Sequence, residues 1–229
     1  MPLLQTRTMP NRPASERLLG ILLTLCLWAG IAGSGGAQAA PGAELWAFWK
    51  QSNEANTETI DHSTWQTILD THLITLTDGR TAFRYQAVSA QHKATLANYL
   101  AELAARDPRR YSRDTQMAYW INLYNALTVQ VVLDHPNKKS ILRMGGGWLP
   151  RGPWDDDAIQ IADQTLTLND IEHRILRPIW QDHRIHFAVN CASYSCPKLF
   201  FRLYKIIILR LNSKYLNSLH LCLLQNLQV

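Results

Sequence analysis

The sequence predicts an α+β fold in which helices pack around a small, mostly antiparallel sheet within a single domain. The stretch from Asp114 to Leu133 contains no Gly or Pro and is apolar nearly all round, which is typical of a buried helix. Thr81–Tyr85 alternates apolar and polar residues after the Asp78-Gly79 turn signal, as a short strand does. Residues 40–197 suit one compact domain in length.

Two further helices and a hairpin follow from apolar spacing and from capping residues. Thr64–Leu73 has apolar residues at helical spacing, and Ser89 can cap a helix over Ala90–Ala105 that ends at Asp107-Pro108. Two alternating segments flank Ala162-Asp-Gln164 and predict a hairpin. Thr167 and Asp170 then open a helix with a pair that resembles a capping box.

The first 39 residues predict a cleaved signal peptide. Three arginines precede the apolar run Leu18–Ile31, and Ala37-Gln38-Ala39 suits a signal peptidase. The run is short for a spanning helix, which needs about 20 apolar residues. We therefore expect a periplasmic or extracellular protein with no spanning segment after cleavage. The alternative is an uncleaved N-terminal anchor.

The last segment, residues 198–229, differs in composition from the body. It contains ten Leu and no Asp, Glu, Gly or Ala, and its five Lys and Arg residues equal the whole net charge of +5. The body is therefore neutral, and the sequence does not predict binding to nucleic acid. The abrupt change predicts a shifted reading frame near Lys198–Phe200, so that the domain is incomplete at its C-terminal end. The rival interpretation is an amphipathic segment that faces a membrane.

The loop Gly145–Trp154 is rich in Gly and Pro and contains two tryptophans, so it could rim a binding cleft. It lacks the lysine and the strand–loop–helix setting of a phosphate-binding loop. No cofactor motif is present elsewhere, and we expect no cofactor.

Polar residues on buried helical faces are the first candidates for a site. Asn122 and Asn125 stand three apart and share a face; they either tie the helix to neighbouring backbone or face an active groove. Glu172 falls within the apolar stripe of the helix that follows Thr167, and His173 lies on its flank. A carboxylate there needs a partner, so Glu172 forms a structural ion pair or orients a catalytic imidazole.

The second group of candidates is the run Ile185–Pro197, which we expect to begin as a strand that ends at Cys191. Cys196 follows five residues later. In an oxidising compartment the two cysteines are an obvious disulfide. A free Cys191 at the end of a strand would instead be a candidate nucleophile. The sequence leaves both interpretations open.

Three segments together resemble the domain of unknown function 547 family (DUF547). They are Tyr119–Thr128, Leu168–Arg177 and Ile185–Pro197, and the resemblance covers roughly residues 60–198. The resemblance implies an exported protein but no particular activity, because the family has none assigned. The sequence departs from the family pattern at Lys198.

The catalytic hypothesis makes Cys191 the nucleophile of an acyl transfer, or of amide or ester hydrolysis, on an unknown envelope substrate. His173 would be the base, with Glu172, Asn122 or Asn125 as orienting or oxyanion groups. On a straight strand His186 would face away from Cys191, and Glu172 could serve His186 instead.

Two other hypotheses compete with catalysis. The chain could be a non-catalytic binding module with a Trp-lined groove and a loop closed by a Cys191–Cys196 disulfide. A metal site built from His173, His183, His186 and Cys191 is the other alternative, but their spacing matches no zinc signature, so we expect none.

Overall fold

The structure is a computed structural model that describes residues 42–147, 150–192 and 199. The described residues belong to one unit, which begins at residue 41. Helices and two small antiparallel sheets make up this unit. The α+β prediction is thus confirmed, although the described strands form two separate pairs rather than one sheet.

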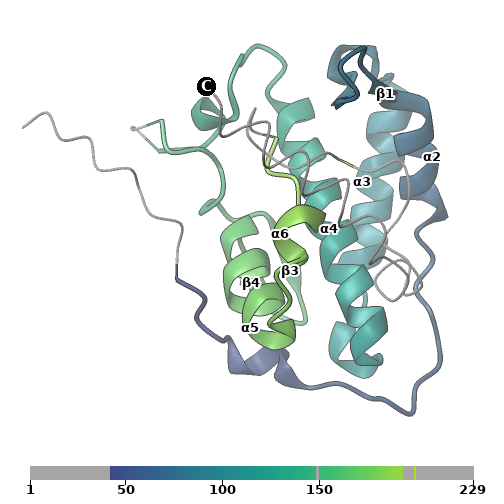
Figure 1. Cartoon of the computed structure of the whole chain (residues 1–229), viewed down its shortest axis with the longest axis vertical. Coiled ribbons are helices and arrows are strands. Elements are labelled where there is room, and N and C mark those ends of the chain that lie inside the picture. Colours follow the sequence, from purple (N-terminus) through teal and green to yellow (C-terminus); the bar gives the residue numbers. More distant parts are fainter. Residues whose placement is uncertain (1–41, 148–149, 193–198, 200–229) are drawn as a thin grey trace, which may run out of the picture. The chain divides into compact units, whose positions relative to one another are not determined.

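Three helices form the centre of the unit: α2 (Ser63–His72), α3 (Ala90–Ala104) and α4 (Arg113–Asp134). Figure 1 shows α3 lying between α2 and α4. Ser89 caps α3 as predicted, because its hydroxyl accepts a hydrogen bond from the amide of His92 at 3.1 Å. Four short 3-10 helices precede, separate or follow them: η1 (Ala47–Lys50), η2 (Tyr85–Ala87), η3 (Pro108–Arg110) and η4 (Ile141–Arg143).

The four strands form two hairpins. β1 (Leu73–Thr75) pairs with β2 (Thr81–Phe83), and β3 (Ile159–Ile161) pairs with β4 (Gln164–Leu166). The second hairpin turns through Ala162 and Asp163 alone. Both have positive φ, 47° and 61°, as a type I′ turn requires.

The helix that follows Thr167 begins as predicted but contains a wide turn. Thr167 and Asp170 each accept a hydrogen bond from the other's amide at 3.0 Å, which confirms the capping pair. The segment η5 (Asp170–Leu176) is a π-helix, and α5 (Arg177–Trp180) continues it. A π-helix bonds each amide five residues back, so residues five apart meet on one face.

The strand predicted from Ile185 to Cys191 is wrong. The structure has a helical turn there, α6 (Ile185–Ala188), before the chain becomes extended at Val189. The Asp182 carboxylate accepts a hydrogen bond from the amide of Arg184 at 2.9 Å, and a local bond of this kind favours a turn. Ile185 and Ala188, three apart, are the buried residues of the turn. The argument that His186 and Cys191 lie on opposite faces of a strand therefore fails.

The core surrounds α4. Its residues from Thr115 to Val129 are all buried, as the lack of a polar face predicts. Trp49 from η1 is 1% exposed and packs edge-on against Trp120 of α4, with ring centroids 5.1 Å apart. The segment before α2 is therefore part of the same core.

Candidate functional site: the Cys191 turn and the groove beside it

The backbone before Cys191 is held by one side chain of α4. Asn125 donates a hydrogen bond from Nδ2 to the carbonyl of Ala188 at 3.0 Å, and its Oδ1 accepts one from the amide of Asn190 at 2.8 Å. Asn125 is 3% exposed, and a buried amide that bonds backbone on both sides of Val189 fixes that segment. Asn125 thus ties the helix to neighbouring backbone, the first of its two predicted roles. Asn122 is also buried in α4.

The chain turns sharply just after this clamp. The side chain of Asn190 accepts a hydrogen bond from the amide of Ala192 at 2.9 Å, which closes an Asx turn around Cys191. Ala192 has a φ of 54°, a left-handed conformation that is unfavourable for residues with a Cβ atom. The surrounding hydrogen bonds therefore impose the conformation that presents Cys191 and Ala192.

Cys191 is disulfide-bonded. A sulfur in a disulfide has no thiolate to attack a carbonyl group. Cys196, the predicted partner, lies outside the described residues, so the Cys191–Cys196 pairing stays a prediction.

Glu172 has the partner that its buried position requires. It is 9% exposed, and its carboxylate accepts two hydrogen bonds from Arg177, the shorter at 2.6 Å from Nη2. The five-residue separation matches the spacing of the π-helix. Burial raises the pKa of Tyr124 well above its ordinary value, and Glu172, which accepts a hydrogen bond from this tyrosine, raises it further.

His173 lies next to this ion pair and is 6% exposed. Burial lowers its pKa; Glu172 opposes the shift and Arg177 adds to it. Its buried Nδ1 has no hydrogen-bond partner among the described residues. His173 is therefore a neutral imidazole near pH 7, as a general base must be.

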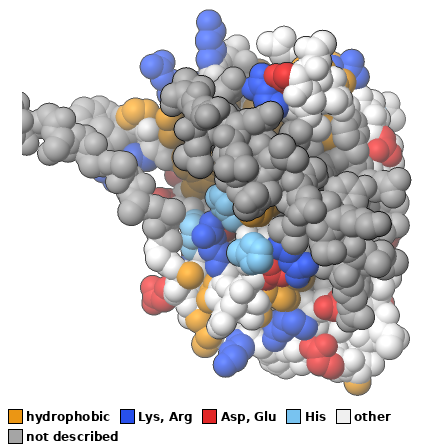
Figure 2. Space-filling model, in the orientation of Figure 1, with side chains coloured by type: hydrophobic (Ala, Val, Ile, Leu, Met, Phe, Trp, Pro, Cys, Tyr) orange, Lys and Arg blue, Asp and Glu red, His pale blue; other side chains and the backbone are white. Residues whose placement is uncertain are grey.

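His186 extends the ion pair to the surface. Its Nδ1 lies 3.3 Å from Nη2 of Arg177, and a guanidinium only donates, so Nδ1 is the acceptor. Figure 2 shows histidine side chains gathered with Lys and Arg on one face of the molecule. Glu172 and His186 thus meet through Arg177, which differs from the direct pairing considered from the sequence.

A groove with a cavity volume of about 1070 Å³ lies beside the Cys191 turn, and Ala192 forms part of its wall. The other walls come from β2 and η2, from α3, from the end of α4, and from the loop that follows α4. We call it the basic groove, because its described lining includes four cationic side chains and no Asp or Glu: Arg84, Lys93, Lys138 and Lys139.

The aromatic lining of the groove differs from the prediction. Phe83 and Tyr85 line it, and no tryptophan occurs among the described lining residues. Trp154 packs against the core instead, and Trp148 lies outside the described residues. No described residue of the Gly145–Trp154 loop lines this groove, so the role of the loop as a cleft rim stays a prediction.

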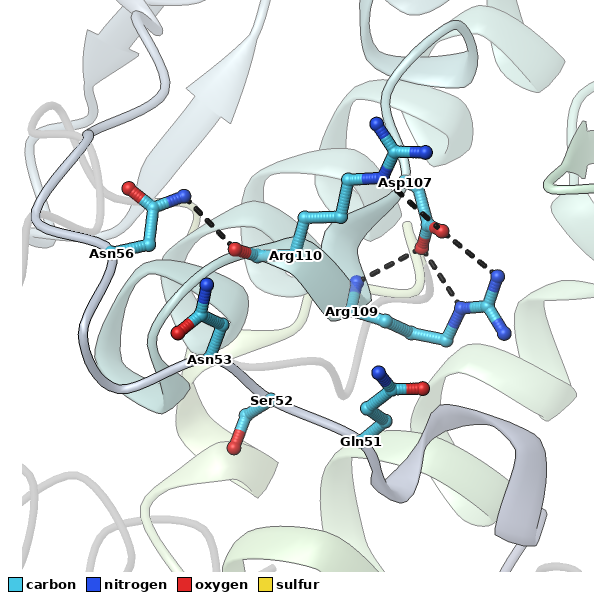
Figure 3. A pocket seen from close by; sticks show the side chains of 7 residues that line it. All are labelled: Gln51, Ser52, Asn53, Asn56, Asp107, Arg109 and Arg110. Atoms are coloured by element: carbon cyan, nitrogen blue, oxygen red, sulfur yellow. Dashed lines mark hydrogen bonds and ion pairs between the residues drawn. The ribbon is translucent and has the colours of Figure 1, made fainter.

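A second hollow of about 530 Å³ lies between the segment after η1 and η3. Figure 3 shows that Asp107 faces both arginines of η3. Arg109 lowers the pKa of Asp107 mainly through a side-chain hydrogen bond. One carboxylate offsets one of the two guanidinium groups, so the charged side chains that line this hollow sum to +1, against +4 in the basic groove.

The described ranges contain neither a metal-binding cluster nor a membrane-spanning helix. No cluster of three or more His, Cys, Asp or Glu side chains there has the geometry to hold a metal ion. None of the helices in that part of the chain combines the length and apolar character needed to cross a membrane.

Sequence reasoning missed Arg177, Tyr124 and the basic groove. Arg177 is five residues from Glu172, a spacing that predicts no contact on an ordinary helix, and the π-helix was not foreseen. The groove is built from segments between residues 83 and 192. The adjacent lysines Lys138 and Lys139 were the one local signal for this groove in the sequence.

Comparison with known proteins agrees with the resemblance seen in the sequence. No curated protein and no solved structure matches the chain significantly. Residues 108–207 match the family described as "Protein of unknown function, DUF547". The match begins later than the expected residue 60 and continues past Lys198, where the composition changes. The segment from η3 through the Cys191 turn is therefore similar to DUF547 proteins.

Proposed function

We propose that the described unit is a ligand-binding domain rather than a permanent cysteine enzyme, and that its ligand lies in the basic groove. The disulfide bond of Cys191 is the observation that carries this proposal. A bonded sulfur is unavailable as a nucleophile, whereas a cross-link next to Ala192 stiffens the wall of the groove. The Asn125 clamp and the Asn190 turn support the same role, because they immobilise that wall from inside.

The state of the cysteines and the hydrolytic activity of the protein together test this proposal. We expect iodoacetamide at pH 6 to leave Cys191 unlabelled in unreduced protein and to label it only after reduction and denaturation. Peptide mapping by mass spectrometry locates the label. Hydrolysis of p-nitrophenyl acetate should be equal in the unreduced wild type and in Cys191→Ser. Labelling of Cys191 without reductant, together with hydrolysis that Cys191→Ser abolishes, would contradict the proposal.

A second candidate is cysteine-dependent acyl transfer, or ester or amide hydrolysis, after the disulfide is reduced. It is favoured by His173, a neutral buried imidazole whose Nδ1 has no partner among the described residues. In this reaction His173 takes the proton of the Cys191 thiol, and the thiolate attacks a carbonyl carbon. A thioester forms as the bond to the leaving group breaks, and the leaving group takes the proton from the imidazolium of His173. Water then hydrolyses the thioester.

Reduced protein distinguishes this candidate from the first. Loss of ester hydrolysis in both His173→Gln and Cys191→Ser, with activity retained in the control His183→Gln, would favour the enzyme. His183 is an exposed residue, so its replacement controls for the loss of an imidazole.

We also propose that the protein is exported and that residues 1–39 are removed. The arginines, the apolar run and the Ala-Gln-Ala site support this proposal. N-terminal sequencing of protein from the periplasm or the medium should then begin at Ala40. A full-length chain in the cytoplasmic fraction would contradict it.

A further inference from the structure

We infer that the basic groove binds a single-chain anionic amphiphile, such as a fatty acid. The carboxylate or phosphate group lies against the basic rim, and the hydrocarbon chain lies against the apolar floor. This inference rests on the proposed binding function and deepens it by naming the class of ligand.

The rim supplies positive charge from several separate elements. Arg84 precedes η2, Lys93 lies on α3, and Lys138 and Lys139 follow α4. Arg84 also donates a hydrogen bond to the carbonyl of Thr71 at 2.8 Å, which holds its guanidinium in place. Since no carboxylate lies among the described lining residues, the potential there attracts an anion.

The floor supplies the apolar surface. Four of its apolar side chains are buried and lie at the base of the groove, and two aromatic side chains are partly exposed. These residues are Val88, Leu133, Ile141, Met144, Phe83 and Tyr85. Burial raises the pKa of Tyr85 to about 12, so its hydroxyl stays neutral well above neutral pH. A polar rim above an apolar floor suits a ligand with one charged end and one apolar end.

The volume and the charge of the groove together select the occupant. About 1070 Å³ lies just above the ~300–1,000 Å³ typical of small-molecule sites, so the groove has room for a ligand with a long apolar chain. The chain's own residues 198–229 are rich in Leu but contain five basic residues and no acidic ones. That segment therefore lacks the negative charge that would complement the rim.

The test uses the full chain in its disulfide form and isothermal titration calorimetry with decanoate. We expect saturable binding of about one decanoate per chain. Acetate and decyltrimethylammonium should bind at least tenfold more weakly, because each lacks one of the two complementary features.

Two variants locate the site. Lys138→Glu/Lys139→Glu should lower decanoate affinity by tenfold or more. The matched control, Lys50→Glu/Arg110→Glu, makes the same change in net charge at exposed positions outside the groove and should bind as the wild type does. Leu142, which is 49% exposed and lines the groove, provides the apolar test. Leu142→Asn, which removes apolar surface without adding charge, should weaken binding while the melting temperature stays unchanged.

The remaining outcomes separate this inference from the proposed function. Equal binding of decanol and decanoate, unaffected by the lysine variants, would overturn the anionic ligand and leave the binding groove standing. Binding to anionic phospholipid vesicles without binding of decanoate would also overturn the inference. Absence of all binding, together with labelling of Cys191 in unreduced protein, would overturn both proposals.

Discussion

At the scale of single residues, buried polar groups have more influence on the structure than their number suggests. Asn125, His62 and Glu172 are each no more than 9% exposed. Each of the three bonds to a specific partner in the described structure. A buried polar group that loses its partner pays a desolvation penalty of about 1–3 kcal/mol, so these positions tolerate few substitutions.

Asn125→Ala should therefore lower the free energy of unfolding by about 2–4 kcal/mol, because it leaves the carbonyl of Ala188 and the amide of Asn190 without a partner. Urea denaturation measures the loss. Asn98→Ala, at an exposed position of α3, is the control and should change stability by less than about 0.5 kcal/mol. Equal stabilities of the two variants would show that the clamp contributes nothing.

His62 predicts a pH dependence of stability. Burial lowers its pKa to about 4, an effect that Asp61 opposes and Arg106 reinforces. The unfolded chain binds a proton below about pH 6.5, and the folded chain does so only near pH 4. Above pH 6.5 the protonation of His62 therefore does not lower the free energy of unfolding. As the pH drops from 6.5 to 4, that free energy falls by about 3 kcal/mol because the unfolded chain gains a proton that the folded chain does not.

The measurement is the free energy of unfolding between pH 4 and 7. His62→Gln should flatten this dependence, and the control His183→Gln should retain the wild-type slope. An unchanged slope in His62→Gln would mean that other groups cause the acid sensitivity.

At the scale of elements, the sequence predicts those parts of the fold that local spacing determines. The helices around Leu69, Leu100 and Trp120, the hairpin at Ala162 and a strand beginning at Thr81 occur as expected, because apolar periodicity, Ser caps and turn residues are local signals. The partner strand β1 was not foreseen. The strand expected before Cys191 fails, since the Asp182 side chain and the burial of Ile185 favour a helical turn there.

The candidate site was less predictable than the fold. Asn125, Glu172, His173 and Cys191 were identified by residue type, but their partners depend on the π-helix and on contacts between distant segments. A spacing of five residues predicts a contact only in a π-helix, and the sequence did not indicate one. The basic groove was not predictable either, because its walls come from segments far apart in the sequence.

The β3–β4 hairpin provides a prediction at this scale. Ala162 has a φ of 47° in the two-residue turn, where Asn is favoured and β-branched residues are strained. Ala162→Asn should stabilise the protein by about 0.5–1 kcal/mol, and Ala162→Val should destabilise it by about 1–2 kcal/mol. Thermal unfolding of the two variants checks the order, and a more stable Val variant would contradict the assigned turn.

At the scale of the whole unit, the segment before α2 belongs to the fold. The amide of Trp46 donates a hydrogen bond to the carbonyl of Arg174 at 2.9 Å, and the Arg113 side chain donates one to the carbonyl of Lys50. With Trp49 packed on Trp120, these contacts connect residues 46–50 to both α4 and η5. A domain boundary near residue 60, where the family resemblance was expected to begin, would cut through the core.

Trp49→Ala should accordingly cost about 3–5 kcal/mol of unfolding free energy, the usual range for a buried tryptophan. Trp49→Phe should cost less, because the indole nitrogen has no hydrogen-bond partner among the described residues. A chain that starts at residue 57 should melt well below one that starts at residue 42. Equal melting temperatures of the two chains would place the segment outside the cooperative unit.

The helix α4 presents no free side to solvent between Thr115 and Val129, and this restricts how its length can vary. One inserted residue rotates everything after it by about 100°. An insertion before Asn125 would swing its amide away from the Ala188 and Asn190 backbone and drive a neighbouring apolar group toward those polar atoms. Functional descendants of this gene should accept insertions in the loops at either end of α4, but none within it.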